Sequence, residues 1–134
     1  MIKNIYIIDD DPDDQELLIE ALHEIDSEVL YFKADDGYDG LQKLHTIDFP
    51  RPDLNFVDLN MPRINGRQFL NQIKQDVVLK DIPIIIYSTS YDEPEVKDLI
   101  KSGAAYFLKK PYSFEDLKIQ LQLLLIKKFE SIRR

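Results

Sequence analysis

Five short apolar runs, separated by segments of helical period, constrain the fold of this 134-residue chain more than any other feature. The runs are rich in β-branched and aromatic residues and do not alternate cleanly with polar ones, which is typical of strands buried on both faces. Strict alternation of strand and helix predicts an α/β fold, in which helices cover both sides of a parallel sheet. We expect the strands at residues 5–8, 29–32, 54–57, 84–87 and 106–108.

The segments between these runs have the periodicity of amphipathic helices. The first should begin near Pro12 with Asp11 as its cap, because proline suits the first helical position and aspartate accepts hydrogen bonds from free N–H groups. Ser113, with Asp116 three residues later, has the spacing of a capping box. The chain shows no internal repeat and no long linker, so we expect a single domain over residues 1–134. The remaining helices are expected at 38–47, 66–76, 94–102 and 114–130.

Composition excludes several classes of function. The chain has no cysteine, which excludes disulfides, thiolate metal sites and cysteine nucleophiles. A net charge of -8 argues against nucleic-acid binding, because phosphate contacts need clustered lysine and arginine. No apolar run approaches the ~20 residues needed to cross a bilayer, and the first run ends in acids, unlike a secretory signal. We therefore expect a cytoplasmic protein that binds neither nucleic acid nor a membrane.

Polar residues follow four of the expected strands. In open α/β sheets, ligands bind at the carboxyl ends of the strands, so these residues should converge. Gathered carboxylates repel one another and suit a hard cation such as Mg2+. A lysine and a hydroxyl opposite the metal would complete a clamp for a transferring phosphoryl group, which an aspartate can carry covalently. The strand-end residues are Asp9-Asp10-Asp11, Asp58, Ser88-Thr89 and Lys109-Lys110.

Each of these residues also has an ordinary structural explanation. Asp11, Asp13 and Asp14 fall in the first turn of a helix, where acids simply favour the helix dipole, and we assign them that role. Ser88 alone could be a turn residue, and either strand-end lysine alone could be a surface residue. Asp58, however, lies between apolar residues at the end of a buried strand, an unusual place for a carboxylate without a task. The functional interpretation rests on their joint placement.

Over about residues 2–126, the chain resembles the response-regulator receiver domain. The resemblance implies a doubly wound (βα)5 fold with the flavodoxin-like strand order 2-1-3-4-5. The acidic run 9–14 also resembles a subgroup of stand-alone regulators paired with phytochrome-like kinases. Four correctly spaced blocks carry the match: Ile8-Asp9-Asp10, Val57-Asp58-Leu59-Asn60-Met61-Pro62 with Gly66, Ile86-Tyr87-Ser88 and Lys110-Pro111.

The resemblance also implies an acceptor and a metal site. Asp58 would accept a phosphoryl group from a sensor histidine kinase or a phosphotransfer protein. Mg2+ would be bound by Asp9, Asp10, Asp58 and the backbone carbonyl of Asn60. The protein would then be a phosphoacceptor of a two-component system rather than an enzyme.

Four further positions acquire roles from the same resemblance. Ser88 and Lys110 would contact the phosphoryl group, and Phe107 would be the aromatic switch residue. Pro111 would follow a cis peptide bond, a backbone feature essentially confined to proline. The chain departs from the family pattern at Thr89, which is larger than the usual alanine or glycine, and at Phe107, which lacks a tyrosine hydroxyl.

The last helix carries two apolar stripes at ~100° per residue. The stripe expected to face the sheet contains Phe114, Leu117, Leu121, Leu124 and Leu125. We expect the second stripe to be a partner surface, for a homodimer or for docking, on the face formed by the fourth helix, fifth strand and fifth helix. Scattered surface hydrophobics are the alternative. The second stripe contains Ile119, Leu123 and Ile126.

Three other functions are compatible with parts of the sequence. A haloacid-dehalogenase-type phosphatase needs more of its motif after the first strand than Pro12 onward provides, and a flavodoxin-like FMN carrier needs a loop there that is not acidic. A degenerate receiver, acting as a phosphorylation-independent interaction module, is the more serious alternative. The presence of all the site residues argues against it.

Overall fold

The computed structural model describes the backbone of residues 2–133 and the side chains up to residue 125. Five parallel strands form one sheet in the order β2-β1-β3-β4-β5, which confirms the predicted fold class and strand order. The strands are β1 (Asn4–Ile8), β2 (Leu30–Ala34), β3 (Leu54–Asp58), β4 (Ile84–Ser88) and β5 (Tyr106–Lys109). The helices are α1 (Pro12–Ile25), α2 (Gly37–Leu44), α3 (Gly66–Lys74), α4 (Glu93–Lys101) and α5 (Phe114–Arg133).

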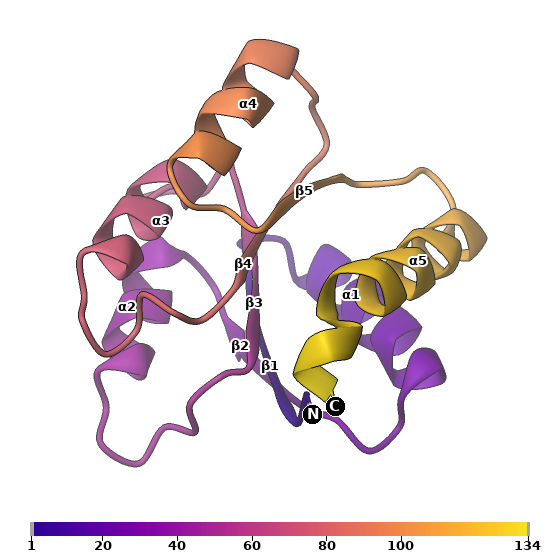
Figure 1. Cartoon of the computed structure of the whole chain (residues 1–134), viewed down its shortest axis with the longest axis horizontal. Coiled ribbons are helices and arrows are strands. Elements are labelled where there is room, and N and C mark those ends of the chain that lie inside the picture. The colour runs from indigo at the N-terminus through magenta and orange to yellow at the C-terminus, as the bar shows by residue number, and fades with distance from the viewer. Residues whose placement is uncertain (1, 134) are drawn as a thin grey trace.

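The helices cover both faces of the sheet. Figure 1 shows the sheet nearly edge-on, with α1 and α5 on one side and α2, α3 and α4 on the other. Each face has its own apolar core, one packed under α1 and α5 and the other under the remaining helices. This is the arrangement in which strand order reverses between β1 and β3, so that the carboxyl ends of these two strands border a crevice.

Local sequence signals account for the helix starts. The Asp11 side chain accepts hydrogen bonds from the N–H groups of Asp13 and Asp14, and Pro12 is the first residue of α1, as predicted. Ser113 Oγ accepts a hydrogen bond of 3.1 Å from the N–H of Asp116, one half of the expected capping box. These caps satisfy N–H groups that have no partner inside the helix, and so define where each helix begins.

The predicted core stripe of α5 is confirmed. Its leucines are buried against the sheet and Phe114 packs beside them. On the second stripe, Ile119 and Leu123 are 52% and 50% exposed. The side chain of Ile126 lies outside the described residues.

Two expectations about the backbone are wrong. Strand β2 is not buried on both faces, because it lies at the edge of the sheet, where Leu30 is 60% exposed. No peptide bond within residues 2–133 is cis, so Pro111 follows a trans bond. The Lys110 N–H donates to the Ser88 carbonyl at 2.6 Å, and this continuation of the β4–β5 pairing is made with the trans form.

No helix in the described part of the chain is long and apolar enough to cross a membrane.

Candidate functional site

The predicted strand-end residues converge at the carboxyl edge of the sheet. Asp58 and Ser88 are the last residues of the adjacent strands β3 and β4, and Asp9 follows β1 directly. Lys110 follows β5, whose last residue pairs with Ser88. All four are brought to one edge because neighbouring parallel strands end together.

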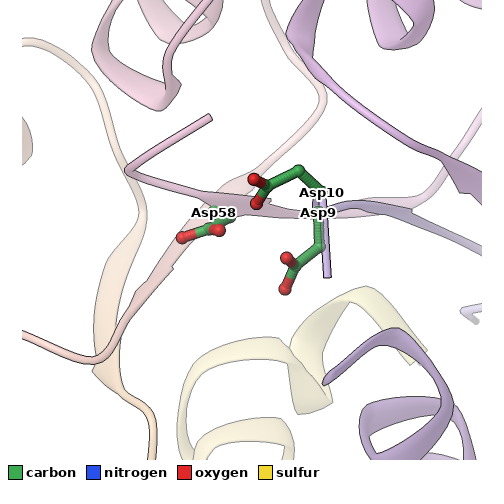
Figure 2. A group of neighbouring side chains, drawn as sticks. All are labelled: Asp9, Asp10 and Asp58. Atoms are coloured by element: carbon green, nitrogen blue, oxygen red, sulfur yellow. The ribbon is translucent and has the colours of Figure 1, made fainter. Parts of the chain in front are cut away.

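Three carboxylates from the ends of β1 and β3 form a cluster. Asp9, Asp10 and Asp58 each offer an oxygen atom, and these atoms lie within 4.8 Å of one another. Figure 2 shows the three side chains gathered where the two strands end. Asp9 and Asp58 are buried, whereas Asp10 is exposed. The cluster therefore combines two carboxylates withdrawn from water with one that solvent can reach.

The buried carboxylates are electrostatically destabilised. Burial raises the pKa of Asp58, and the nearby charge of Asp9 raises it further, to about 7. Burial likewise raises the pKa of Asp9, while the N–H of Asp11 and the ammonium of Lys110 oppose that rise. Oxygen donors that repel one another in this way fit a hard divalent cation, which relieves the repulsion. The acidic cluster thus fits a divalent metal site.

Lys110 is the cation of this edge, and its side chain is 9% exposed. Its Nζ donates to Asp14 Oδ2 at 2.8 Å and to Asp9 Oδ2 at 3.0 Å, and lies 3.7 Å from Asp58 Oδ2. Burial disfavours the ammonium, but the carboxylates of Asp14, Asp58 and Asp9 outweigh it and raise the pKa of Lys110 above its usual value. Lys110 therefore remains protonated. Lys109, by contrast, is exposed.

The contact with Asp14 was missed by sequence reasoning, which assigned this residue to the helix dipole alone. Asp14 does lie in the first turn of α1, next to the cap. It is also the nearest carboxylate to Lys110, although the two residues are 96 positions apart. No sequence signal distinguishes Asp14 from Asp13 except the helical period, which places them about 100° apart on α1.

Ser88, the last residue of β4, and Phe107, in the adjacent strand β5, are both buried. Ser88 is fully buried, and its Oγ lies 3.2 Å from Ser90 Oγ while accepting a hydrogen bond from the Ser90 N–H. The Phe107 ring is buried and packs edge-on against the exposed ring of Tyr91, with 5.7 Å between their centroids. Thr89, which directly follows Ser88, is exposed.

The loop from β3 to α3 carries Asn60 and is held in an unusual conformation. Arg63 has φ of 64°, a left-handed value that is rare for a residue other than glycine. Its guanidinium donates two hydrogen bonds to Asp36 Oδ2, at 3.0 and 2.7 Å, and lies 4.5 Å from the centroid of the Tyr38 ring. Contacts with the start of α2 therefore secure the loop. Sequence reasoning missed them.

Gly66 brings α3 against the acceptor strand. A Cβ at this position would lie 2.6 Å from the backbone oxygen of Asp58 and 2.8 Å from the Cα of Leu59. Both neighbours are backbone atoms that cannot move without displacing the end of β3. The glycine of the sequence motif is thus explained by close approach of two backbone segments.

The fold and the acidic cluster together define a class of protein: a doubly wound α/β domain whose carboxyl edge fits a divalent metal. The family described as response regulator receiver domain matches residues 5–122. The chain therefore belongs to the response regulator receiver domain family of two-component systems. Members of this family act as phosphoacceptors and interact with histidine kinases or phosphotransfer proteins.

Several relatives match along most of their length. The response regulator Rcp1 of Synechocystis sp. is 32% identical over 124 residues, covering 86% of this chain and 81% of Rcp1. Protein PilH of Pseudomonas aeruginosa is 33% identical, covering 87% of this chain and 92% of PilH. Other relatives are much longer. The chain spans 7% of the hybrid signal transduction histidine kinase D of Dictyostelium discoideum and 49% of the probable C4-dicarboxylate response regulator DctR of Halalkalibacterium halodurans.

Solved structures agree with these relatives. The phosphorylated cyanobacterial phytochrome response regulator RcpA superposes with a TM-score of 0.87 at 26% identity, covering 98% of this chain and 96% of RcpA. The Mn(2+)-bound form of Rcp1 superposes with a TM-score of 0.83 at 28% identity, covering 96% of each chain. Both comparisons therefore support the resemblance to stand-alone regulators, and one of the structural neighbours, RcpA, is a phytochrome response regulator.

Proposed function

We propose that this receiver accepts a phosphoryl group on Asp58, with Mg2+ bound by Asp9, Asp10, Asp58 and the backbone carbonyl of Asn60. One observation carries the proposal: the carboxylate oxygens of Asp9, Asp10 and Asp58 lie within 4.8 Å of one another beside the Lys110 ammonium. The solved relatives add support, since the RcpA structure is phosphorylated and the Rcp1 structure is Mn(2+)-bound.

The transfer needs little chemistry from the protein beyond positioning and charge. A carboxylate oxygen of Asp58 attacks the phosphorus atom of a phosphohistidine on the donor protein. The P–N bond breaks, and its electron pair remains on the departing imidazole, which then takes a proton from water. The product is an acyl phosphate on Asp58. Mg2+, when bound, would neutralise charge on the carboxylates and on the phosphoryl oxygens.

The side chains around Asp58 act on the transferred group. Lys110 supplies a positive charge 3.7 Å from the Asp58 carboxylate, where negative charge accumulates during transfer. The buried hydroxyl of Ser88, at the end of the adjacent strand, would donate a hydrogen bond to a phosphoryl oxygen. Movement of Ser88 toward that oxygen would change the packing around Phe107 and Tyr91, and so alter the face of α4, β5 and α5.

Labelling tests the acceptor directly. Incubation with acetyl phosphate and Mg2+ should add one acid-stable, base-labile phosphoryl group, detected by intact mass, and Asp58→Asn should lose it. Asp48→Asn, which removes an exposed carboxylate from the α2–β3 loop, is the matched control and should label like the wild type. Equal labelling of Asp58→Asn would contradict the assignment. A wild type that is neither labelled nor able to bind beryllofluoride would favour the phosphorylation-independent interaction module.

We also propose that the receiver works as a stand-alone regulator whose output passes through another protein. Its match to most of the length of Rcp1, PilH and RcpA supports this. The phosphoryl donor would be a sensor histidine kinase or a phosphotransfer protein. Pull-down with the beryllofluoride-bound protein as bait, compared with the metal-free protein, would identify partners that recognise the activated state.

The exposed stripe of α5 supports a contact surface for a second copy or a target. Ile119 and Leu123 are about half exposed and lie one helical turn apart. Changing both to lysine should leave the fold and Asp58 labelling intact but reduce any dimer seen by analytical ultracentrifugation. A wild type that stays monomeric with and without beryllofluoride would exclude the dimer.

A further inference from the structure

We infer that Asp14 is a positioning residue that holds Lys110 away from the acceptor carboxylate and thereby opposes occupation of the site by a phosphoryl group. The inference rests on the function proposed above and assigns to α1 a part in controlling that site. It follows from the contacts of one ammonium group.

Lys110 is shared unequally among three carboxylates. Its Nζ lies 2.8 Å from Asp14 Oδ2 and 3.0 Å from Asp9 Oδ2, both hydrogen bonds, but 3.7 Å from Asp58 Oδ2, which is too long for one. The side chain is almost fully buried, so these contacts rather than water determine where the ammonium lies. Asp14 therefore holds the cation on the α1 side of the site.

A phosphoryl group on Asp58 would attract the Lys110 ammonium away from Asp14. Its oxygens carry more negative charge than the carboxylate, and they lie beyond the Asp58 oxygen to which the phosphorus is bonded. For Lys110 to pair with them, its ammonium has to give up at least part of the contact with Asp14. The carboxylate of Asp14 also adds a negative charge close to that position, which repels an incoming anion.

Asp9 does not act in the same way, because it is a proposed partner of the metal. Mg2+ bound to Asp9 would neutralise that carboxylate and weaken its hold on Lys110. Asp14 is not part of the acidic cluster of Asp9, Asp10 and Asp58, so its hold on Lys110 persists when the metal is present. Among these three carboxylate partners, Asp14 is thus the one whose effect is separable from metal binding.

The neighbouring Asp13 provides a matched control. Both residues lie in the first turn of α1 and both favour the helix dipole, so their substitutions share any general effect on helix stability and charge. Asp13 is exposed, and it is not among the carboxylates that contact Lys110 in the described part of the chain, which are Asp9, Asp14 and Asp58. Any difference between the two variants therefore reports on the contact with Lys110.

The test measures beryllofluoride affinity by isothermal titration calorimetry at saturating Mg2+. We expect Asp14→Asn to bind beryllofluoride about three- to tenfold more tightly than wild type, a range suited to a partly exposed charge pair. Asp13→Asn should change the affinity less than twofold, by the weak effect of an exposed charge. Asp14→Glu, which keeps the charge and can still reach Lys110, should remain close to wild type.

A double-substitution cycle shows whether the effect passes through the lysine. In a Lys110→Gln background, Asp14→Asn should raise the beryllofluoride affinity much less than it does when Lys110 is present. An unchanged or weaker affinity in Asp14→Asn, or the same gain in both backgrounds, would overturn the inference. A wild type that binds no beryllofluoride would instead contradict the proposed function, so the two failures are distinguishable.

Discussion

Strand β3 carries two buried polar side chains, of which one has polar and charged partners and the other has none among the described residues. Asp58 ends the strand at the carboxyl edge, where it accepts a hydrogen bond of 3.3 Å from the Asn60 N–H and faces Lys110. Asn55, three residues earlier, is fully buried, and neither polar atom of its side chain has a hydrogen-bond partner among the described residues. Charges and hydrogen-bond donors therefore surround Asp58, whereas the Asn55 side chain has no such partner in the described part of the chain.

The difference shows where this fold tolerates a cost in stability. The unpartnered buried amide of Asn55 destabilises the folded state and lies away from the site that would bind a ligand. The carboxyl edge also concentrates unfavourable charge, but there it is arranged around a position that can bind a cation and a phosphoryl group. Substitutions that remove charge at the carboxyl edge should therefore raise stability and weaken binding. Substitutions of Asn55 should change stability alone.

The largest expected effect lies at the carboxyl edge. Replacing Asp9 and Asp10 together by alanine should lower Mg2+ affinity by about 100-fold or more, because it removes two of the proposed oxygen donors. Burial is the larger cause of the raised pKa of Asp58, and the double change removes the second cause, the nearby charge of Asp9. We therefore expect the metal-free variant to unfold at higher urea concentration than the metal-free wild type, with a gain of roughly 1–2 kcal/mol at one pKa unit per ~1.4 kcal/mol.

Calorimetric titration with Mg2+ measures the affinity, and urea unfolding in EDTA measures the stability of the metal-free protein. Asp13→Asn removes an exposed carboxylate outside the cluster and should change neither. Unchanged Mg2+ affinity in the double variant would place the metal elsewhere and remove the contrast between the two ends of β3.

The second effect separates two adjacent lysines, Lys109 at the end of β5 and Lys110 directly after it. Lys110→Ala removes the cation next to Asp58, so phosphorylation should no longer be coupled to the change at the output face. Lys109→Ala should be nearly silent because that side chain is exposed. Binding of a partner to the phosphorylated and unphosphorylated forms measures the coupling. The opposite ranking of the two variants would mean that Lys109, and not Lys110, couples phosphorylation of Asp58 to the output face.

These two cases also show what the sequence could establish. The parallel α/β fold and the convergence of Asp9, Asp58 and Ser88 could be predicted, because short buried strands in βα alternation leave few arrangements of their ends. The strand order itself followed from the resemblance to receiver domains. The apolar run of β2 could not be identified as an edge strand, since a run of this kind does not state how many neighbours it has. Leu30 is exposed for that reason.

Two kinds of feature could not be predicted from the sequence: contacts between side chains far apart in the chain, and backbone conformations that differ little in energy. The pairing of Asp14 with Lys110 depends on how the first turn of α1 lies against the end of β5, which periodicity does not determine. The left-handed Arg63 gave no signal, because glycine or asparagine is the usual indicator. The cis bond expected before Pro111 was wrong, and only ~0.5–1 kcal/mol separates the two forms of an X–Pro bond.

At the other end of β3, Asn55→Val should stabilise the protein. The substitution removes two unpartnered polar atoms from a fully buried site and supplies a β-branched side chain to a central strand. We expect the free energy of unfolding to rise by about 1 kcal/mol, measured by urea unfolding, with no change in Mg2+ or beryllofluoride affinity. Asn55→Asp, which buries a charge at the same place, should destabilise strongly. A loss of stability in Asn55→Val would mean that the amide is satisfied, for example by a buried water.

The smallest effect tests whether charge far from the carboxyl edge influences only stability. His45 follows α2, where its Nδ1 lies 2.8 Å from the Leu41 carbonyl and its Nε2 lies 3.1 Å from Asp76 Oδ2. The carbonyl of Leu41 and the carboxylate of Asp76 raise the pKa of His45 above its usual value. Because the folded-state pKa is the higher one, the stabilisation is fully present below the unfolded value of about 6.5 and is lost as pH rises through the folded value.

Wild type should therefore be slightly more stable than His45→Gln at pH 5.5, and the difference should vanish above the folded pKa of His45. Asp76→Asn keeps the carbonyl contact of His45 but removes the carboxylate, so its pH dependence should be intermediate. Urea unfolding from pH 5 to 9 in EDTA measures these differences, which stay small because both side chains are reached by solvent. A difference between wild type and His45→Gln that does not vary with pH would show that packing, not the charge on the ring, joins α2 to the end of α3. A change in beryllofluoride affinity in either variant would show that the two ends of the sheet are energetically linked, and that substitutions far from the carboxyl edge affect more than stability.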